Sequence, residues 1–153
     1  MAVTGDSSSP RRRSDVVGFK RSRPILSAGL IERFDNRILI ALPPQPPRPS
    51  RLWRFPRGRV ADSESPEEAM RRIAQDDLEI AVEIVIGQPP FLAELDGEEV
   101  ELRFFICGSD ATEASRGPYE EIRWIERGHL YEYEFDTITQ PVVEWFLDAD
   151  GGR

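Results

Sequence analysis

Hydrophobic and polar residues along the chain follow patterns that are typical of a mixed sheet with two helices. Strand-like runs are expected at 24–34, 37–44, 52–55, 79–87, 91–95, 98–108 and 119–126. Apolar residues at helical spacing predict helices at 65–78 and 138–149. Because the helices follow separate groups of strands, we predict an α/β fold of the α+β kind, an α/β/α sandwich with a mixed β-sheet between helices.

Local signals also fix where these elements begin and turn. Ser65 is an expected helix N-cap, Pro66 suits the first turn, and Glu68 lies three residues after Ser65, as in a capping box. Asp35-Asn36 and Asp96-Gly97 suit tight hairpin turns between neighbouring strands. Ala69 and Ala74 are expected to face the sheet.

Composition indicates one domain with flexible ends. The chain has 153 residues, of which 39% are hydrophobic and 31% charged, enough to bury a single core. We expect a flexible basic tail at 1–22, a single domain at 23–148 and a flexible C-terminal end at 149–153. The arginines at 11–13 suit a solvated tail or contact with a partner, and the prolines at 43–49 predict a loop whose PxxP spacing also suits a recognition segment.

Charge and cysteine content exclude several classes of protein. A formal net charge of −8 argues against general nucleic-acid binding, which needs a basic face. There is no secretion signal or membrane-length apolar run, so we expect a cytoplasmic protein with no membrane partner. The one cysteine, Cys107, excludes an internal disulfide framework and is expected to be a core thiol. Trp53, Tyr119 and Trp124 are expected in the core or at its rim, although such rings could also stack on a base.

The stretch RFPRGRVADSESPEEAMRRIAQDDLEI, residues 54–80, resembles the signature of the Nudix family, G-x5-E-x7-R-E-U-x-E-E-x-G-U, where U is aliphatic. Gly58 is followed after five residues by Glu64 and then after seven by Arg72, and Ile80 closes the pattern. The resemblance covers roughly residues 24–148, because the flanking strands and C-terminal helix also agree with the Nudix fold.

The chemistry of the signature is degenerate. Ile73 replaces the glutamate that follows the arginine, and Asp76 and Asp77 replace the paired glutamates. Glu79 replaces the second glycine, and Arg57 replaces the first glycine of the family's Pro-Gly-Gly entry. The helix therefore offers two carboxylates where the family has three.

The resemblance implies roles for the remaining acidic residues. Nudix hydrolases cleave the pyrophosphate bond of a nucleoside diphosphate linked to another moiety, with Mg²⁺ or Mn²⁺ held by carboxylates. Asp76 and Asp77 are the implied metal ligands and catalytic groups, and Glu120 or Glu121 could supply a further ligand or base. Glu120 and Glu121 could equally be ordinary exposed acids. Because Ile73 cannot ligate a cation, metal binding is expected to be weak.

The other residues of this stretch have two expected roles, one structural and one in substrate binding. The resemblance implies that Glu64 and Arg72 form a structural ion pair that fastens the loop to the helix. Arg54, Arg57, Gly58 and Arg59 are candidates for substrate binding, since arginine suits phosphate recognition, although solvated loop arginines are the alternative.

Two functions are consistent with these residues. The first is a Nudix-type hydrolase that acts weakly on a small-molecule nucleotide or phosphoanhydride. This is the favoured interpretation if the protein is an enzyme. The second is a non-catalytic Nudix domain that binds a nucleotide or a protein partner. Either function is compatible with a homodimer.

Overall fold

The computed structural model describes residues 23–44 and 51–151, with side chains described as far as residue 148. The tail predicted at 1–22, most of the proline-rich loop at 43–49 and the last two residues lie outside the described residues. Within the described part, no helix combines the length and hydrophobicity needed to cross a bilayer.

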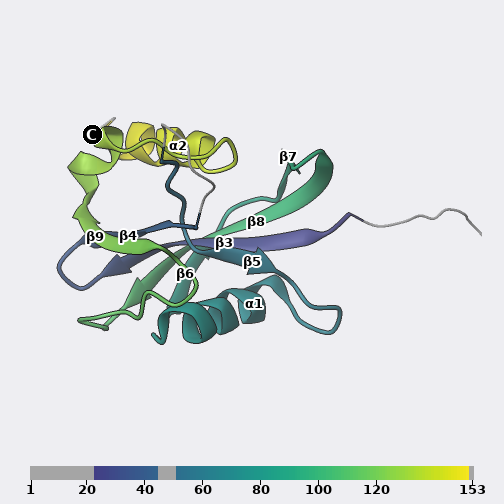
Figure 1. The fold of residues 1–153 in the computed structure, drawn as a ribbon, viewed down its shortest axis with the longest axis horizontal. Helices are drawn as coiled ribbons and strands as arrows, with labels where there is room; N and C mark the ends of the chain where they lie inside the picture. The colour runs from purple at the N-terminus through teal and green to yellow at the C-terminus, as the bar shows by residue number, and fades with distance from the viewer. Residues whose placement is uncertain (1–22, 45–50, 152–153) are drawn as a thin grey trace, which may run out of the picture.

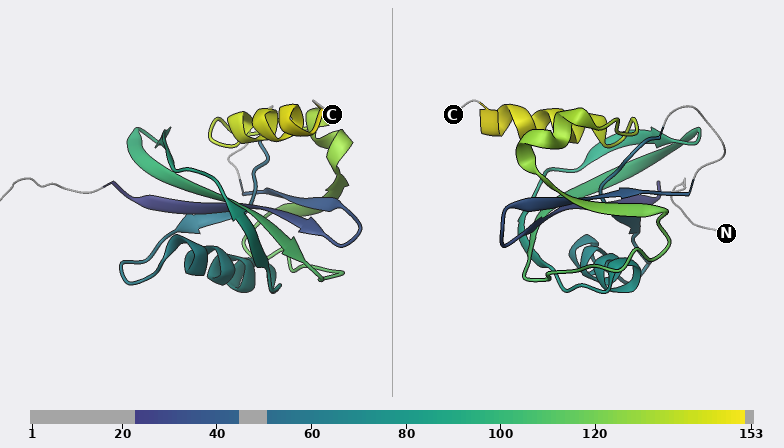
Figure 2. Two further views of the ribbon diagram at one scale, coloured as in Figure 1. Left: turned by 180° about the vertical axis from the view of Figure 1, so that it is seen from behind. Right: turned by 60° about the vertical axis from the view of Figure 1, so that its left-hand side comes forward.

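The described chain forms one mixed sheet with a helix on each face, as Figures 1 and 2 show from three directions. The strands are β3 (Ile25–Arg33), β4 (Arg37–Leu42), β5 (Arg57–Arg59), β6 (Glu83–Gly87), β7 (Phe91–Leu95), β8 (Glu98–Ser109) and β9 (Glu121–Glu126). The helices are α1 (Pro66–Ile73), the π-helical turn η1 (Ala74–Leu78), the 3₁₀ helix η2 (Arg127–Glu132) and α2 (Gln140–Gly151). The predicted α/β/α sandwich is confirmed.

Strand β3 lies at the centre of the sheet and positions the site. The strand order is β6-β8-β3-β4-β9, with β5 also paired to β3 and β7 to β8. β3 runs parallel to β8 along its whole length, so β4 and β5 both pair with its other edge. Directly before β5, the chain is anchored to β3 by a hydrogen bond from the Gly29 N–H to the Pro56 carbonyl (3.0 Å).

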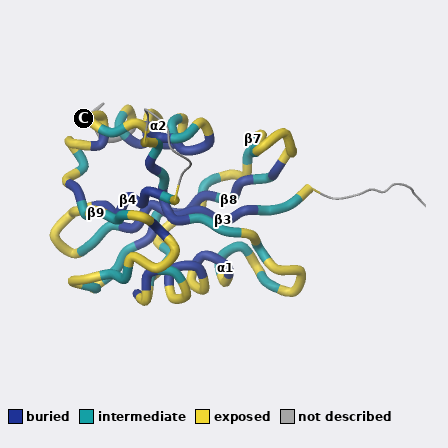
Figure 3. The backbone as a smooth tube through the Cα atoms, in the orientation of Figure 1, coloured by how far each residue is buried: buried dark blue, intermediate teal, exposed yellow. Residues whose placement is uncertain are grey.

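The core has two layers, one on each face of the sheet, and the buried positions in Figure 3 follow the central strands. Neighbouring residues of β8 point to opposite faces of the sheet. Phe104 packs in the core layer under α2, and Phe105 packs in the core layer under α1. Ala69 and Ala74 are fully buried on the α1 side, as predicted. Cys107 is buried in the same layer, and burial raises the pKa of its thiol to about 12.

Several predicted element boundaries are wrong, each for a local reason. The strand predicted at 52–55 is reduced to two isolated bridges, from Trp53 to Phe135 and from Arg54 to Ala41, because Pro56 interrupts the backbone pairing. β5 was not predicted, since the sequence Arg-Gly-Arg lacks a strand-like pattern. The strand predicted at 79–87 begins only at residue 83.

That late start reflects the conformation of Glu79, which ends the π-helical turn with φ 58° and ψ 40°. A non-glycine residue in this left-handed region costs about 1–2 kcal/mol, and the family signature has glycine there. We expect Glu79→Gly to stabilise the domain by about 1 kcal/mol, less the added entropy of the unfolded chain. Urea unfolding measures the change, with Glu79→Ala as the control that removes the charge but keeps the positive φ. Equal stabilisation by both variants would contradict a conformational cause.

Candidate phosphate-binding site

Helix α1 begins where its sequence signals place it, directly after the Gly58 loop. The Ser65 hydroxyl accepts a hydrogen bond from the Glu68 N–H (3.1 Å), and the Glu68 carboxylate accepts one from the Ser65 N–H (2.8 Å). This capping box fixes the first turn, and therefore fixes how the loop enters the helix.

Glu64 and Arg72 tie that loop to the helix. Arg72 donates from Nε to Glu64 Oε2 (2.7 Å) and from Nη2 to Glu64 Oε1 (3.0 Å), so the ion pair is bidentate. Arg72 also donates to the Arg59 carbonyl (2.8 Å), while the Ala61 N–H donates to Glu64 (3.0 Å). The hydrogen bonds from Arg72 and from Ala61 lower the pKa of Glu64.

Ile73 is buried beneath the same loop. Its side chain is 3% exposed, and its Cδ1 and Cγ1 lie 3.0 and 3.1 Å from where a Cβ on residue 58 would stand. Gly58 is therefore needed for close packing of the loop on α1, and Ile73 supplies apolar contact at the position where the family signature has a carboxylate.

Asp76 and Asp77 lie in the π-helical turn at the end of α1. Asp76 is 63% exposed and has its carboxylate 4.0 Å from Arg72 Nη1. Asp77 is partly buried, and its burial and the neighbouring charge of Asp76 raise the pKa of its carboxyl group. These are the only two aspartates of the turn, and the turn is held in place by a hydrogen bond from the Ser115 N–H to the Leu78 carbonyl (2.7 Å).

The other candidate acids form ion pairs with arginines. Glu121 accepts from Arg123 Nε (2.6 Å) and Arg51 Nη2 (3.1 Å), and Glu120 lies 3.5 Å from Arg51. Among residues 23–44 and 51–151, no three Asp, Glu, His or Cys side chains come together in a group that could hold a metal ion. The acids present thus do not fit the carboxylate set that the signature implies for a divalent cation.

Arg54 and Arg57 converge on one carboxylate, that of Asp136. Arg57 Nη1 donates to Asp136 Oδ2 (2.9 Å), and Arg54 Nε lies 3.6 Å from the same oxygen. The Arg57 side chain is 6% exposed. Among residues 23–44 and 51–148, the buried Nε of Arg54 has no hydrogen-bond partner, and burial together with the charge of Arg57 lowers the pKa of Arg54. Two guanidinium groups therefore share one negative charge in a part of the protein that is largely shielded from water.

Two further residues belong to this arginine pair. Asp136 uses its second oxygen, Oδ1, to accept from the Thr139 N–H (3.0 Å) just before α2. Burial and the charge of Asp77 raise the pKa of the Tyr119 hydroxyl, and the nearby backbone of Arg57 and charge of Arg54 act in the opposite direction. Tyr119 thus lies within electrostatic reach of both the arginines and the end of the acidic turn. The sequence predicted Tyr119 as a ring in the core or at its rim that could also stack on a base, and it gave no role to Asp136.

The third arginine that the sequence suggested for substrate binding, Arg59, lies apart from this pair. Arg59 is 68% exposed, and its nearest acidic partner is Glu98 at 3.6 Å. The three candidate arginines are therefore divided into a buried pair and one solvated residue.

An α/β/α sandwich in which a glycine loop enters a capped helix, with a Glu-Arg ion pair between loop and helix, defines the class of fold. The NUDIX domain model matches residues 23–146, and the chain belongs to this family. No curated protein sequence matches the chain.

Solved structures show the same fold. The ORF135 protein of E. coli is 22% identical, with a TM-score of 0.73, covering 86% of this chain and 93% of its own. The MutT protein of Methanosarcina mazei Go1 is 17% identical, with a TM-score of 0.70 and coverage of 89% and 100%. A C. elegans Ap4A hydrolase is 15% identical, with a TM-score of 0.66 and coverage of 85% and 99%.

Proposed function

We propose that this Nudix domain binds a phosphorylated small molecule, a nucleoside diphosphate or a related phosphoanhydride, through Arg54 and Arg57. The observation that carries the proposal is the pairing of two guanidinium groups with the single carboxylate of Asp136, while the buried Nε of Arg54 has no hydrogen-bond partner among the described residues. A bound phosphate would supply both the missing negative charge and the missing hydrogen-bond acceptor.

Arginine is suited to this task because its planar fork donates two parallel hydrogen bonds to phosphate oxygens. Asp136 holds Arg57 in one orientation before any ligand arrives, so little side-chain entropy is lost on binding. Burial and the charge of Arg57 lower the pKa of Arg54, and a bound anion would offset both effects.

In this proposal hydrolysis is weak, because catalysis by the family depends on a divalent cation. Such a cation would neutralise phosphate oxygens and activate water, but the described acids do not form a group that fits it. A weak Nudix hydrolase remains the second candidate function, favoured by the adjacent carboxylates of Asp76 and Asp77 at the position of the family's paired glutamates.

Binding is tested by calorimetry with inorganic pyrophosphate and with ADP, GDP, CDP and UDP, in the presence of a chelator and again with Mg²⁺. We expect binding in chelator, and we expect Arg54→Gln and Arg57→Gln each to weaken it by at least about tenfold, because each removes a charged donor from a buried site. Arg59→Gln is the matched control: it makes the same change of charge in the same loop at an exposed position, and it should alter affinity by less than about twofold.

Three results would contradict the proposal. They are the absence of binding to every compound, an equal loss in all three variants, or binding that requires Mg²⁺ and is abolished by Asp77→Asn. Phosphate release from the same compounds with Mg²⁺ separates the second candidate, since a hydrolase would turn them over and lose activity in Asp77→Asn.

A further inference from the structure

An open groove with a volume of about 830 Å³ lies at one end of the sheet, between the β3–β4 hairpin and the segment that joins η1 to β6. Apolar side chains form part of its wall: Phe34 is 67% exposed, Val85 is 66% exposed, and Ile106 of β8 lies beside them. Gly108 also lines the groove, and a Cβ there would meet only Val85, at 3.9 Å. Large apolar side chains therefore border open space here.

Unmatched negative charge surrounds these apolar residues. Three exposed carboxylates line the groove and form no ion pair within the described part of the chain: Glu79, Glu83 and Asp110. The other charges at the groove are already paired, since Arg33 lies 2.8 Å from Asp35 and Glu32 lies 3.2 Å from Arg127. This acidic groove therefore suits a cationic segment that also carries apolar side chains.

The acidic groove lies beside the outer edge of β6. Among the described strands, β6 ends the order β6-β8-β3-β4-β9, and no strand pairs with its outer edge. Val85 and Ile86 of this strand are 66% and 54% exposed. An apolar edge of this kind is a template for pairing with other chains, and proteins commonly cover it with a loop or another segment.

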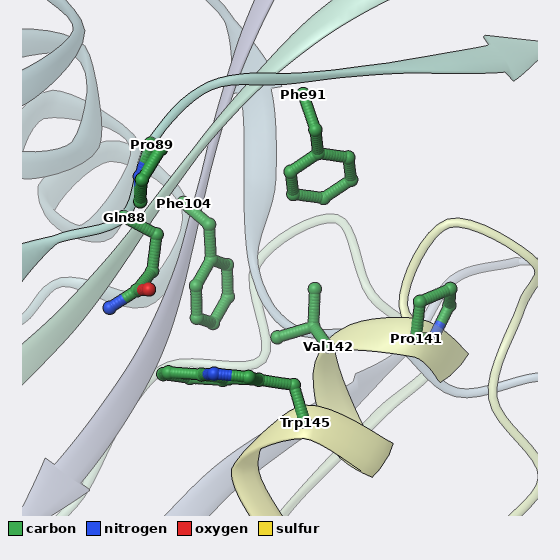
Figure 4. Close-up of a pocket in the computed structure, with 7 residues that line it drawn as sticks. All are labelled: Gln88, Pro89, Phe91, Phe104, Pro141, Val142 and Trp145. Carbon is green, nitrogen blue, oxygen red and sulfur yellow. The ribbon is translucent and has the colours of Figure 1, made fainter.

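A second pocket, of about 250 Å³, differs from the acidic groove in its charge. It lies between α2 and the strands β7 and β8, and Figure 4 shows its aromatic and aliphatic wall with Gln88 at one side. No charged residue lines it. A basic segment would thus gain no ionic contact there, whereas the acidic groove offers three carboxylates.

The chain itself contains a segment with the complementary chemistry. Residues 10–23 read PRRRSDVVGFKRSR, in which three consecutive arginines at 11–13 precede the apolar pair Val16 and Val17. This segment joins the described domain at Arg23, whose Nε lies 2.8 Å from Glu99 Oε1. Its point of attachment to the domain is therefore defined.

The spacing within this segment matches the distance to the acidic groove. Along β3, which begins at Ile25, Leu30 is paired with Ile106 and Glu32 is paired with Gly108. Seven strand residues span about 23 Å and two strand spacings about 10 Å, so the far end of the groove is about 25 Å from the start of β3. At about 3.3–3.6 Å per extended residue, the valines reach the level of Ile106 and the arginines reach the carboxylates beyond it.

We propose that residues 11–17 dock in the acidic groove of the same chain and cover the outer edge of β6. Val16 and Val17 pack against Val85, and the arginines at 11–13 pair with the three carboxylates of the groove. This docking is independent of the proposed phosphate site, because neither Arg54 nor Arg57 lines the groove.

Disulfide trapping in the full chain tests the docking. Val16→Cys is combined with Val85→Cys, and in a control with Leu92→Cys, and each variant is oxidised with diamide. Leu92 is also an exposed strand residue, and it pairs with Glu101, which lies opposite Ile25, so it is closer to Arg23 than Val85 is. The buried Cys107, with the pKa of its thiol raised to about 12, stays unreactive.

We expect the intramolecular disulfide with residue 85 to form at least about tenfold faster than that with residue 92, because docking raises the effective concentration at the groove alone. Changing Arg11, Arg12 and Arg13 together to glutamine should slow it at least about fivefold. Raising the salt to about 0.5 M should also slow it, since salt screens exposed charges. Lys20→Gln with Arg21→Gln is the control: these residues are too near Arg23 to reach the groove, so the rate should change by less than about twofold.

Three results would overturn the proposal. Equal rates for the two cysteine pairs, or a faster disulfide with residue 92, would show that residues 11–17 have no preference for the groove. A disulfide with residue 85 that links two molecules, with a yield that rises with protein concentration, would assign the groove to a second copy's segment. An unchanged rate in the triple arginine variant would remove the ionic basis of docking. None of these results bears on Arg54 and Arg57, so the proposed function would stand.

Discussion

Replacing Gly117 by alanine is expected to destabilise the domain by about 3–4 kcal/mol, or about 10 °C in Tm. Gly117 has φ +54°, and a Cβ there would overlap the backbone carbonyl of Asp77. The added methyl group therefore combines the penalty of a left-handed residue, about 1–2 kcal/mol, with a collision that only a backbone shift can relieve. Thermal unfolding followed by circular dichroism measures the loss.

Two other glycines separate these contributions. Gly97 has φ +81° with nothing near the added Cβ, so Gly97→Ala should show the conformational penalty alone. Gly128 has an ordinary φ and open space around the added Cβ, so Gly128→Ala should leave Tm almost unchanged. A Gly117→Ala variant no less stable than Gly97→Ala would show that the loop does not rest on the acidic turn.

Replacing Ile73 by glutamate, the residue that the family signature has at this position, is expected to destabilise the domain by about 3 kcal/mol at pH 7. The position is buried under Gly58, so a charged carboxylate there would lose its hydration without gaining a partner. Burial would raise the pKa of the new glutamate in the folded state above its unfolded value of about 4.3. The penalty should therefore be small below about pH 4 and grow as the pH rises through and above that value.

Ile73→Gln is the matched control for this pH dependence. It introduces a polar side chain of the same length without a titrating group, so its loss of stability should not grow with pH beyond that of the wild type. Mg²⁺ calorimetry on both variants completes the test, and we expect no gain in affinity from the glutamate. If Ile73→Glu binds Mg²⁺ more tightly while remaining stably folded, the expected burial penalty is wrong, and the second candidate function, a weak hydrolase, is favoured.

The sequence predicted those features that depend on neighbouring residues. Ser65, Pro66 and Glu68 specify the start of α1 among themselves, and the structure has that start. The spacing of Glu64 and Arg72 places one residue in the loop and the other two turns into the helix, and their side chains meet as the signature implies. Asp96 and Gly97 both have positive φ, as a two-residue hairpin turn requires.

Features that depend on residues far apart in the chain could not be predicted in this way. Arg57 and Asp136 are 79 residues apart, and nothing in either local sequence indicates the other. The pairing arises because the segment around Phe135 lies parallel to Trp53. The sequence also showed that Ile73 removes a carboxylate, but the burial of Ile73 under the loop depends on how α1 sits against β5, which no local pattern contains.

The central position of β3 has a consequence for how the molecule forms. β3 is the first described strand, and its longest partner is β8, which is made only after the glycine loop, α1 and the β6–β7 segment. Closing so long a loop costs entropy before the parallel pairing returns any stability, and topologies of this kind fold slowly. During synthesis, α1 and the turn η1 with Asp76 and Asp77 therefore have no complete sheet to pack on until β8 has left the ribosome.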